Sequence, residues 1–487
     1  MKPNQFVFGL KNFARAYKEL NVMSKFLKRG LPVLVIVALL VVALLPSNDA
    51  KPAKAQDPVT IRIFVGVGTG YLPEQQAAQV ALADEWNAAH EDIKIEFEFH
   101  DNETARDELL TQVSGGDVPA IVGPAGVRTV FEVSDLWADI TSYIERDGDQ
   151  LNLDDFDATS FGLYQLGDRQ IAIPLGVYPS FIYVNETIFA DAEVELPPTE
   201  YGAWTYEDLR AAAIAVTQDA NGVYNGEDGF DPAAIEVYGY YPFWTNFRAS
   251  TIGFSPDDAG VLIGEDGTVT ATFNQDAFRQ AVKFFHDGIF VDHFIPSADA
   301  EGAIGEGVTN PFTSNRIAMG RSHTWLFGGI KSAMDDGNFT ADWNVYPVPV
   351  APNGKTTAAV HADTFAIMDG FENKDAAWEV LKWLTAPEQA LALCQVYGCM
   401  PARLSVRSEW ESYWLEAFPF LNLDVVYGAL EYLDAPNHEG YMPNYARAWD
   451  ALEAFWQVVR SDPELDVDAG LDALNAEVQG IFDEAAQ

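Results

Sequence analysis

The chain has 487 residues, a length that suggests two or three domains. Hydrophobic residues make up 48% of it, which suffices to bury large cores and excludes a disordered protein. Its 29 Lys and Arg residues stand against 73 Asp and Glu residues, and the net charge of −44 argues against nucleic-acid binding, because phosphates need clustered cations. The two cysteines exclude a disulfide scaffold and a multi-cysteine metal site.

The N-terminal head is basic, unlike the rest of the chain. Residues 1–55 hold nine Lys and Arg residues and two acidic ones, which leaves 20 basic and 71 acidic residues in 56–487. Seven of the cations precede an apolar run from Leu31 to Leu45, and small residues stand at 53 and 55. This order predicts a secretory signal cleaved after Ala55, and therefore an exported, periplasmic or cell-surface protein. The alternative is a retained anchor that tethers the protein, although 15 helical residues span only about 22 Å of a ~30 Å hydrocarbon layer.

The first part of the body alternates strands and helices. Period-two patterns predict strands at 59–65 and 93–99 and a short buried strand at 119–123, with helices at 73–89 and 106–113 between and after them. This alternation predicts an α/β fold with a largely parallel sheet. Gly66, Gly68 and Gly70 follow the first strand but lack the third glycine of a dinucleotide site. They are better interpreted as a turn at the carboxyl edge of the sheet, where such sheets bind ligands.

The remaining elements follow in order. We expect an extended segment at 171–178, a strand at 181–185, a helix from the Thr205 cap to 217, a helix at 276–287, a strand leading into a loop at 315–325, an extended crossing at 347–352, a strand at 364–367, and helices at 375–384, 445–459 and 471–482. The polar loop 219–231 begins like a calcium loop but lacks the bidentate acid at its twelfth position. Whether it binds calcium or is a solvated loop stays open.

The two cysteines are five residues apart. With Gly398 between them, Cys394 and Cys399 can close a small disulfide, which suits an oxidising compartment outside the cytoplasm. The alternative is a pair of buried, unpaired thiols.

Three stretches contain patterns in a specific order. The first comprises 183–189, 196–199 and 204–209, and the second comprises 316–319 with Trp325 six places after Met319. The third comprises 363–367, 373–378 and 381–385, followed by 398–403. Together they resemble the extracellular solute-binding proteins of ABC importers, of the type that includes maltose- and other sugar-binding proteins, over nearly all of 57–487.

The resemblance implies an α/β, two-lobe periplasmic-binding-protein-like (type II) fold with hinge crossings and discontinuous lobes. We place lobe 1 at 57–174 and 352–400, lobe 2 at 178–345 and 404–487, and the crossings near 174–178, 346–352 and 398–404. It also implies a monomeric binding protein, not an enzyme, that captures a sugar or oligosaccharide and delivers it to ABC permease subunits in the membrane. We expect no cofactor, no metal and no nucleic-acid partner.

A sugar site needs aromatic rings for the C–H face of the sugar and planar polar groups for its hydroxyls. Trp325, in a predicted loop and in a matching segment, is the first candidate for a stacking platform. Trp244 and Phe243 lie in an aromatic loop containing Pro242, where core packing is an equal alternative. Tyr178, at the expected hinge, and Trp449, near the start of a C-terminal helix, are weaker candidates.

Polar candidates come from the segments after or before predicted strands. They are Thr69, Tyr71, Asp101, His361, Asp363 and Arg403. In so acidic a chain, Asp101 or Asp363 could equally be a solvated or capping carboxylate. Cations are scarce in the body, which favours Arg403, although it could instead pair structurally with an acid.

Two other functions compete with sugar binding. A secreted glycoside hydrolase also uses an acidic, aromatic cleft, but nothing in the sequence picks out its two catalytic carboxylates. A binding protein for another small solute, such as a peptide, a polyamine or an iron chelate, is the second alternative. The aromatic loops favour sugar, and the seven histidines are scattered along the chain.

Overall fold

The computed structural model describes residues 57–243, 246–305 and 310–485. The predicted signal segment and Trp244 lie outside these residues. From Pro58 onward the chain forms one compact unit. Within the described residues, none of the helices combines the length and the apolar character needed to cross a membrane.

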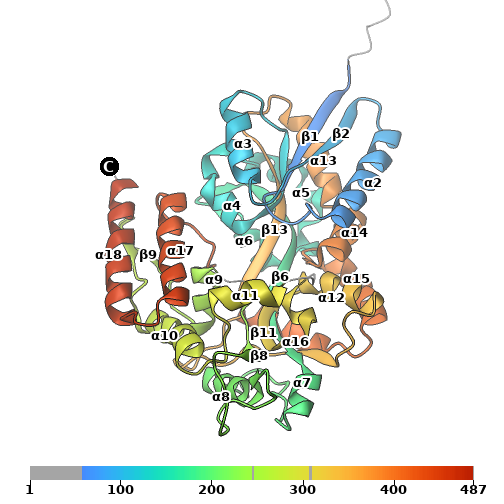
Figure 1. Ribbon diagram of the computed structural model, residues 1–487. Coiled ribbons are helices and arrows are strands. Elements are labelled where there is room, and N and C mark those ends of the chain that lie inside the picture. The colour runs from blue at the N-terminus through green and yellow to red at the C-terminus, as the bar shows by residue number, and fades with distance from the viewer. Residues whose placement is uncertain (1–56, 244–245, 306–309, 486–487) are drawn as a thin grey trace, which may run out of the picture. The chain divides into compact units, whose positions relative to one another are not determined.

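A ten-stranded mixed sheet runs through this unit (Figure 1). Its main path follows the order β2-β1-β3-β13-β6-β11-β8-β7, and β12 and β14 pair with β6 beside that path. The strands are β1 (Val59–Val65), β2 (Ile93–Phe99), β3 (Ile121–Gly126), β6 (Ala172–Asn185), β7 (Gln218–Asp219), β8 (Ile235–Tyr240), β11 (Ile317–His323), β12 (Trp343–Tyr346), β13 (Val360–Ile367) and β14 (Met400–Pro401). Two small hairpins are separate from it, β4 (Gln165–Leu166) with β5 (Arg169–Gln170) and β9 (Val261–Ile263) with β10 (Val269–Ala271).

The prediction of a largely parallel sheet is wrong for the middle of this sheet. β1 pairs in parallel with β2 and β3, and β11 pairs in parallel with β8, as βαβ units require. Between these two groups, however, β13 and β6 pair antiparallel with each other and with their outer neighbours β3 and β11. The antiparallel centre arises because these two long strands carry the chain in opposite directions between the two parallel groups.

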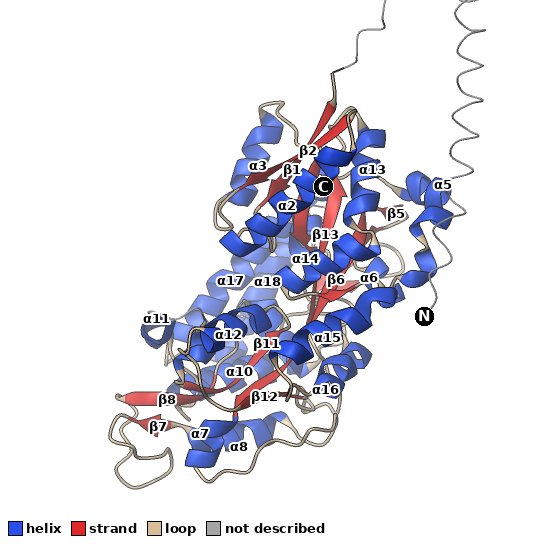
Figure 2. Ribbon diagram, turned by 90° about the vertical axis from the view of Figure 1, so that its right-hand side faces the viewer, coloured by secondary structure: helices blue, strands red, loops and turns tan. Residues whose placement is uncertain are grey.

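Strand β6 joins the two parallel groups as one continuous element. The sequence predicted an extended segment and a separate strand here, yet all 14 residues of β6 are buried in a single strand. Residues 172–179 pair with β13, and residues 180–185 pair with β11 and β12. In Figure 2, β6 and β13 accordingly extend from the region of β1 and β2 to the region of β11 and β12.

Helices cover the sheet, and most of the longer ones match their predicted ranges. They are α2 (Pro73–Ala89), α3 (Ala105–Ser114), α4 (Val127–Glu132), α5 (Thr141–Leu151), α6 (Ala158–Gly162), α7 (Glu186–Asp191), α8 (Tyr206–Val216), α9 (Phe247–Thr251), α10 (Asp276–Phe290), α11 (Ala298–Gly305), α12 (Leu326–Asp335), α13 (Lys374–Leu384), α14 (Pro387–Tyr397), α15 (Arg407–Ala417), α16 (Leu423–Gly428), α17 (Tyr445–Ser461) and α18 (Val467–Ala485). Helix α2 packs on β2 through Leu82 and Trp86, and Thr205 caps α8 by accepting the Asp208 N–H bond at 3.2 Å.

Two large hydrophobic clusters form the core. One contains residues of β1, β3 and β13 together with apolar side chains of 312–345 and 410–426. The other contains residues of α8, α10, α17 and α18 with parts of β6 and β11. The clusters therefore share β6 and do not follow the predicted lobe boundaries residue by residue, and the division into lobes with three crossings stays a prediction.

The loop 219–231 is held by its own hydrogen bonds. Asp219 accepts backbone N–H bonds from Asn221 at 2.8 Å, from Val223 at 3.0 Å and from Asp231 at 3.0 Å. Both carboxylate oxygens are thereby used to shape the loop, as in an Asx turn.

Candidate functional site

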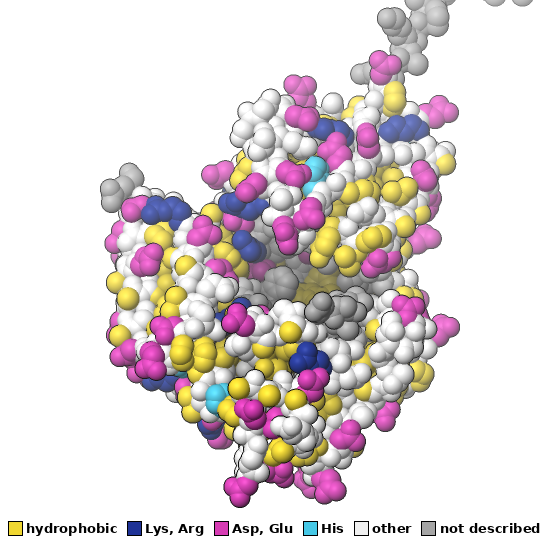
Figure 3. All heavy atoms as spheres, in the orientation of Figure 1, with side chains coloured by type: hydrophobic (Ala, Val, Ile, Leu, Met, Phe, Trp, Pro, Cys, Tyr) yellow, Lys and Arg dark blue, Asp and Glu magenta, His cyan; other side chains and the backbone are white. Residues whose placement is uncertain are grey.

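A cavity of about 1260 Å³ opens beside the ends of β1, β3 and β11. Segments far apart in the sequence line it, because the carboxyl ends of β1, β2 and β3 meet the middle of β13 and β6 there. Figure 3 shows a hollow in this face of the molecule, and acidic side chains are spread over the surface around the hollow. The lining includes residues 67–75, 102–106, 126–132, Tyr178, 325–336, 361–363, 395–397, Tyr413, Trp414 and Glu439, with gaps inside these ranges.

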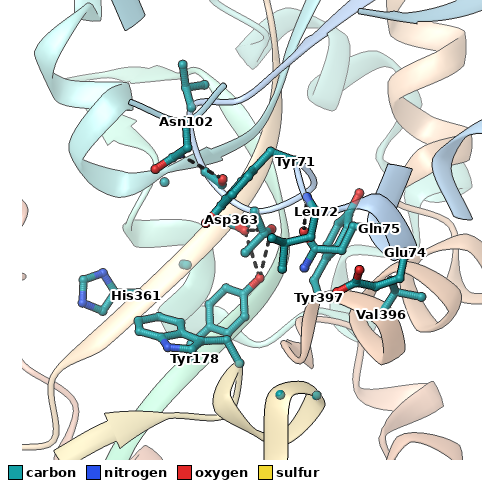
Figure 4. A pocket seen from close by; sticks show the side chains of 18 of the residues that line it. Tyr71, Leu72, Glu74, Gln75, Asn102, Tyr178, His361, Asp363, Val396 and Tyr397 are labelled. Carbon is teal, nitrogen blue, oxygen red and sulfur yellow. Dashed lines mark hydrogen bonds between the residues drawn. The ribbon is translucent and has the colours of Figure 1, made fainter. Parts of the chain in front are cut away.

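A buried carboxylate stands in the wall of the cavity. Asp363 on β13 accepts hydrogen bonds from the hydroxyl of Tyr178, at 2.9 Å, and from the hydroxyl of Thr69 (Figure 4). The Tyr178 and Thr69 hydroxyl oxygens are themselves 3.3 Å apart. Burial raises the pKa of Asp363 above its ordinary value, although these two hydrogen bonds act in the opposite direction. The three groups form a polar cluster from three separate chain segments.

Local structure explains how Thr69 reaches this carboxylate. Thr69 lies in the loop between β1 and α2, and helix α2 holds that loop because Gln75 accepts the Gly70 N–H bond at 2.8 Å and Gln79 donates to the Gly70 carbonyl at 2.7 Å. At Gly68 a Cβ atom would lie 2.7 Å from the Pro124 carbonyl oxygen and 3.2 Å from a carboxylate oxygen of Asp363. Gly68 is therefore needed for the close approach of this turn to Pro124 and Asp363.

Aromatic rings form the adjoining wall. Trp325, half-buried at the start of α12, has its ring 5.3 Å from that of Tyr178 and stacks on His323 at 4.0 Å. It also meets His361 edge-on at 5.2 Å. Tyr71, which is 38% exposed, lines another part of the cavity, and burial and the charge of Asp101 raise its pKa. The cavity thus offers both a ring surface and a polar cluster.

Histidines that are scattered in the sequence come together beside this wall. His438 Nε2 lies 3.2 Å from His361 Nε2, and His438 Nδ1 lies 2.7 Å from an oxygen of Asp434. His361 Nδ1 is 3.3 Å from a carboxylate oxygen of Glu439. Burial lowers the pKa of His438, an effect that Asp434 partly offsets. Burial alone would raise the pKa of Glu439, but its electrostatic interaction and hydrogen bond with His361 bring that pKa below its usual range.

The charged groups around the cavity are mostly acidic. Seven acidic residues line it against three basic ones, and each of the three basic residues is paired. Arg106 contacts Glu132 at 2.8 Å, Arg128 contacts the same carboxylate at 3.6 Å, and Lys331 contacts Asp335 at 2.5 Å. Because each cation already contacts a carboxylate and the acidic residues outnumber the basic ones, an anionic solute would meet a repulsive field, whereas a neutral one would not.

Six of the residues predicted from the sequence line the cavity. They are Thr69, Tyr71, Tyr178, Trp325, His361 and Asp363. Their roles as ligand contacts stay a proposal, but the structure places them together, although they come from four different parts of the chain.

Four other predicted residues lie outside the lining. The Arg403 guanidinium is buried and pairs with Asp155 at 3.2 Å, the structural alternative stated for it above. Phe243 packs edge-on against Phe312, with ring centroids 6.0 Å apart, as a core residue would. Trp449 is buried behind Arg128, whose guanidinium lies 4.2 Å from the ring centroid. Exposed Asp101 caps the next turn by accepting the Glu103 N–H bond at 2.9 Å.

Sequence reasoning missed several lining residues. Asn102 lies three residues after the second predicted strand and donates to the Gly66 carbonyl at 2.7 Å, so the rule about strand ends could have found it. Tyr397 and Trp414 belong to helices and read as core residues, and Glu439 lies in an irregular segment without a motif. These three carried no local signal.

The disulfide that the sequence predicts is present. Cys394 and Cys399 are bonded, and both sulfur atoms pack on β6 at Gly176, where a Cβ atom would lie within 2.7 Å of each. Three of the four residues that the disulfide encloses, Gln395, Val396 and Tyr397, line the cavity. The bond therefore restrains a segment that contributes to the site.

The comparisons with known proteins identify the family. The model of the bacterial extracellular solute-binding protein family matches residues 69–391. The chain belongs to this family. As its name states, its members are solute-binding proteins, and the segments that carry the resemblance in the sequence fall largely within the matched range.

Several solved structures share the fold of this solute-binding protein. An ABC substrate-binding protein from Listeria monocytogenes in complex with cycloalternan has a TM-score of 0.69 at 20% identity, over 87% of this chain and 99% of that one. A cyclic alpha-maltosyl-1,6-maltose binding protein from Arthrobacter globiformis has a TM-score of 0.63 at 21% identity, over 88% and 100%. UgpB from Mycobacterium tuberculosis, in complex with glycerophosphocholine, has a TM-score of 0.67 at 15% identity, over 89% and 100%. The α/β, two-lobe fold of the periplasmic binding proteins is therefore the fold of this chain.

Among curated proteins, an uncharacterized lipoprotein from Streptomyces antibioticus is 26% identical over 185 residues. That match covers 38% of this chain, and the chain spans only 39% of the length of this relative.

Proposed function

We propose that this solute-binding protein captures an uncharged, hydroxyl-rich solute, a sugar or an oligosaccharide, in the cavity around Asp363 and Trp325. The observation that carries the proposal is the meeting of an aromatic wall with a buried polar cluster in one cavity. Rings stack on the C–H face of a sugar, and a carboxylate accepts hydrogen bonds from its hydroxyls. Protein ligand pockets usually have about 300–1,000 Å³, so a volume of about 1260 Å³ leaves room for more than one sugar ring.

The charge of the cavity separates this proposal from its nearest alternative. The Mycobacterium tuberculosis neighbour was solved with glycerophosphocholine, a zwitterion whose phosphodiester anion needs an unpaired cation in the site. Here the three lining cations are paired with carboxylates and the acidic residues outnumber them. A neutral saccharide, such as the ligands of the Listeria and Arthrobacter neighbours, suits this environment better.

The proposal includes a transport role. The protein would be exported, held at the cell surface or released, and would deliver its solute to ABC permease subunits. Capture would occur as two lobes, joined by crossings near 174–178, 346–352 and 398–404, close on the solute. Continuous strands such as β6 and β13, which pass from one half of the sheet to the other, suit such crossings.

A thermal-shift screen tests the proposal. A ligand that binds the native state alone stabilises it, by about 2.7 kcal/mol at a free concentration of 100 times Kd. We expect at least one mono- or oligosaccharide to raise the melting temperature, while glycerophosphodiesters, peptides and polyamines leave it unchanged. The reverse pattern would contradict the sugar assignment. Release of new reducing ends from a stabilising oligosaccharide would instead support the hydrolase alternative.

A further inference from the structure

Three side chains beside the cavity have the composition of a metal site. His361 lies on β13, and His438 and Glu439 lie in the segment before α17; one ligand atom from each lies within 4.8 Å of the other two. All three residues are buried, yet His361 and Glu439 also line the cavity. Two imidazole nitrogens and one carboxylate oxygen form a ligand set that zinc uses in sites with an open fourth position.

The surroundings fix the orientation of His438. Asp434 contacts its Nδ1 at 2.7 Å and accepts its backbone N–H bond at 2.7 Å. The other oxygen of Asp434 accepts the Val360 N–H bond at 2.7 Å, which ties this carboxylate to the strand that carries His361. A carboxylate bound to the far nitrogen of a histidine is the usual support of a metal-binding imidazole. Nε2 of His438 is left directed at His361.

The spacing of the two imidazoles suits a shared ion. Zinc binds nitrogen at about 2.0–2.1 Å in tetrahedral geometry, which places two ligand nitrogens about 3.4 Å apart. The two Nε2 atoms are 3.2 Å apart. When Nδ1 of His438 donates its hydrogen to Asp434, Nε2 of His438 directs a lone pair at Nε2 of His361. If Nε2 of His361 also carries a lone pair, a cation between the two nitrogens offsets their repulsion at this distance.

We propose that His361, His438 and Glu439 bind one divalent cation with the ligand preference of zinc, and that its open position faces the solute cavity. The competing arrangement is a chain from Asp434 through His438 and His361 to Glu439 in which a shared proton bridges the two Nε2 atoms. Both arrangements satisfy the same distances, but only the first takes up metal. The proposal does not depend on the identity of the solute, and its test needs no saccharide.

Calorimetric titration of zinc chloride into the chelator-treated, dialysed protein distinguishes the two. We expect one zinc ion per chain, binding at least 10-fold more weakly to His438→Ala and, because removal of a supporting carboxylate typically weakens metal binding by about 10–100-fold, also more weakly to Asp434→Asn. His293→Asn is the matched control, because His293 has a left-handed backbone (φ 59°) that Asn tolerates, and it lies outside the cluster.

Two results would overturn the proposal. One is the absence of zinc binding to the wild-type protein, which would favour the shared proton. The other is unchanged zinc affinity in His438→Ala, when the circular dichroism spectrum of this variant shows that it is folded. If His438→Ala does not fold, Glu439→Gln replaces it, since Gln keeps an acceptor for the Arg128 N–H bond that Glu439 accepts at 3.2 Å but removes the charge.

Discussion

Two buried carboxylates, Asp155 and Asp363, show how similar side chains serve different purposes in this molecule. Asp155 pairs with the Arg403 guanidinium at 3.2 Å and accepts bonds from the Ser405 N–H, at 2.8 Å, and the Ser405 hydroxyl, at 2.9 Å. Asp363 accepts bonds from the hydroxyls of Tyr178 and Thr69, and within the described part of the chain it forms no ion pair with Lys or Arg.

The difference follows from what surrounds each carboxylate. A buried charge needs a partner charge or several hydrogen bonds, and Asp155 has both within the fold. Asp363 lacks the cation, faces a cavity, and has a pKa raised by burial. A closed ion pair stabilises the fold, whereas a carboxylate that borders a cavity without an ion-pair partner has capacity left for a solute.

The largest expected effect comes from opening the closed pair. Arg403→Leu leaves the Asp155 carboxylate buried without its cation, which should lower the free energy of unfolding by about 3–5 kcal/mol. Saccharide affinity should stay unchanged, because Arg403 lies outside the cavity lining. Urea unfolding followed by tryptophan fluorescence, together with calorimetry, measures both. A loss of saccharide affinity at unchanged stability would place Arg403 in the binding site and contradict the distinction between Asp155 and Asp363.

Asp363→Asn should have the opposite effects, a loss of saccharide affinity without a loss of stability. Hydrogen bonds to charged groups contribute about 1.5–3 kcal/mol, so the saccharide Kd should rise by about 10- to 150-fold. Stability should be kept or increased, because burial disfavours the charged form of Asp363. Asp155→Asn is the matched control, with the same chemical change at the other carboxylate. It should lower stability and leave affinity unchanged, and equal effects of the two substitutions on affinity would contradict the account.

Trp325→Ala tests the aromatic wall that faces the polar cluster. Loss of a stacked ring should weaken saccharide binding by about 1–3 kcal/mol, as measured by calorimetry. Trp383→Ala is a suitable control, since Trp383 is also partly buried but packs on Trp86, at 5.1 Å between ring centroids, away from the cavity. Unchanged affinity in Trp325→Ala would remove this ring from the site.

The smallest expected effect is on the pH dependence of stability, through a third carboxylate, that of Asp147. Hydrogen bonds from Arg146, Trp378 and Lys382 hold the pKa of Asp147 well below its usual range. A folded-state pKa below the unfolded value of about 3.9 contributes stability above that pH, which is lost as the pH falls further. The stability difference between wild type and Asp147→Asn should therefore be constant from pH 7 to about pH 5 and shrink below about pH 4. A difference that grows in acid would contradict this sign.

Local patterns in the sequence were sufficient for much of the fold. The strand 59–65 and the helix 73–89 have the predicted bounds, because period-two and amphipathic patterns are local properties of the chain. The antiparallel centre was missed because strand direction depends on how β6 and β13 pass between the halves of the sheet, which no local pattern encodes.

The site was only partly predictable, for the same reason. The positions after β1 and β11 pointed correctly to Thr69 and Trp325 as cavity residues. Arg403 was chosen because free cations are scarce, but its pairing with Asp155 depends on contact across about 250 residues of chain. The cluster of His361, His438 and Glu439 likewise exists only once the segment before α17 packs on β13.

Hydrogen–deuterium exchange with and without the most stabilising saccharide tests most directly whether the cavity is the binding site. We expect slower exchange, on addition of the saccharide, in the peptides that contain the cavity lining at 67–75, 126–132, 325–336 and 395–397. The β9–β10 hairpin and the exposed end of α18, which contribute nothing to the lining, should be unchanged. Slower exchange confined to segments outside the lining, with the cavity peptides unaffected, would show that the saccharide binds elsewhere.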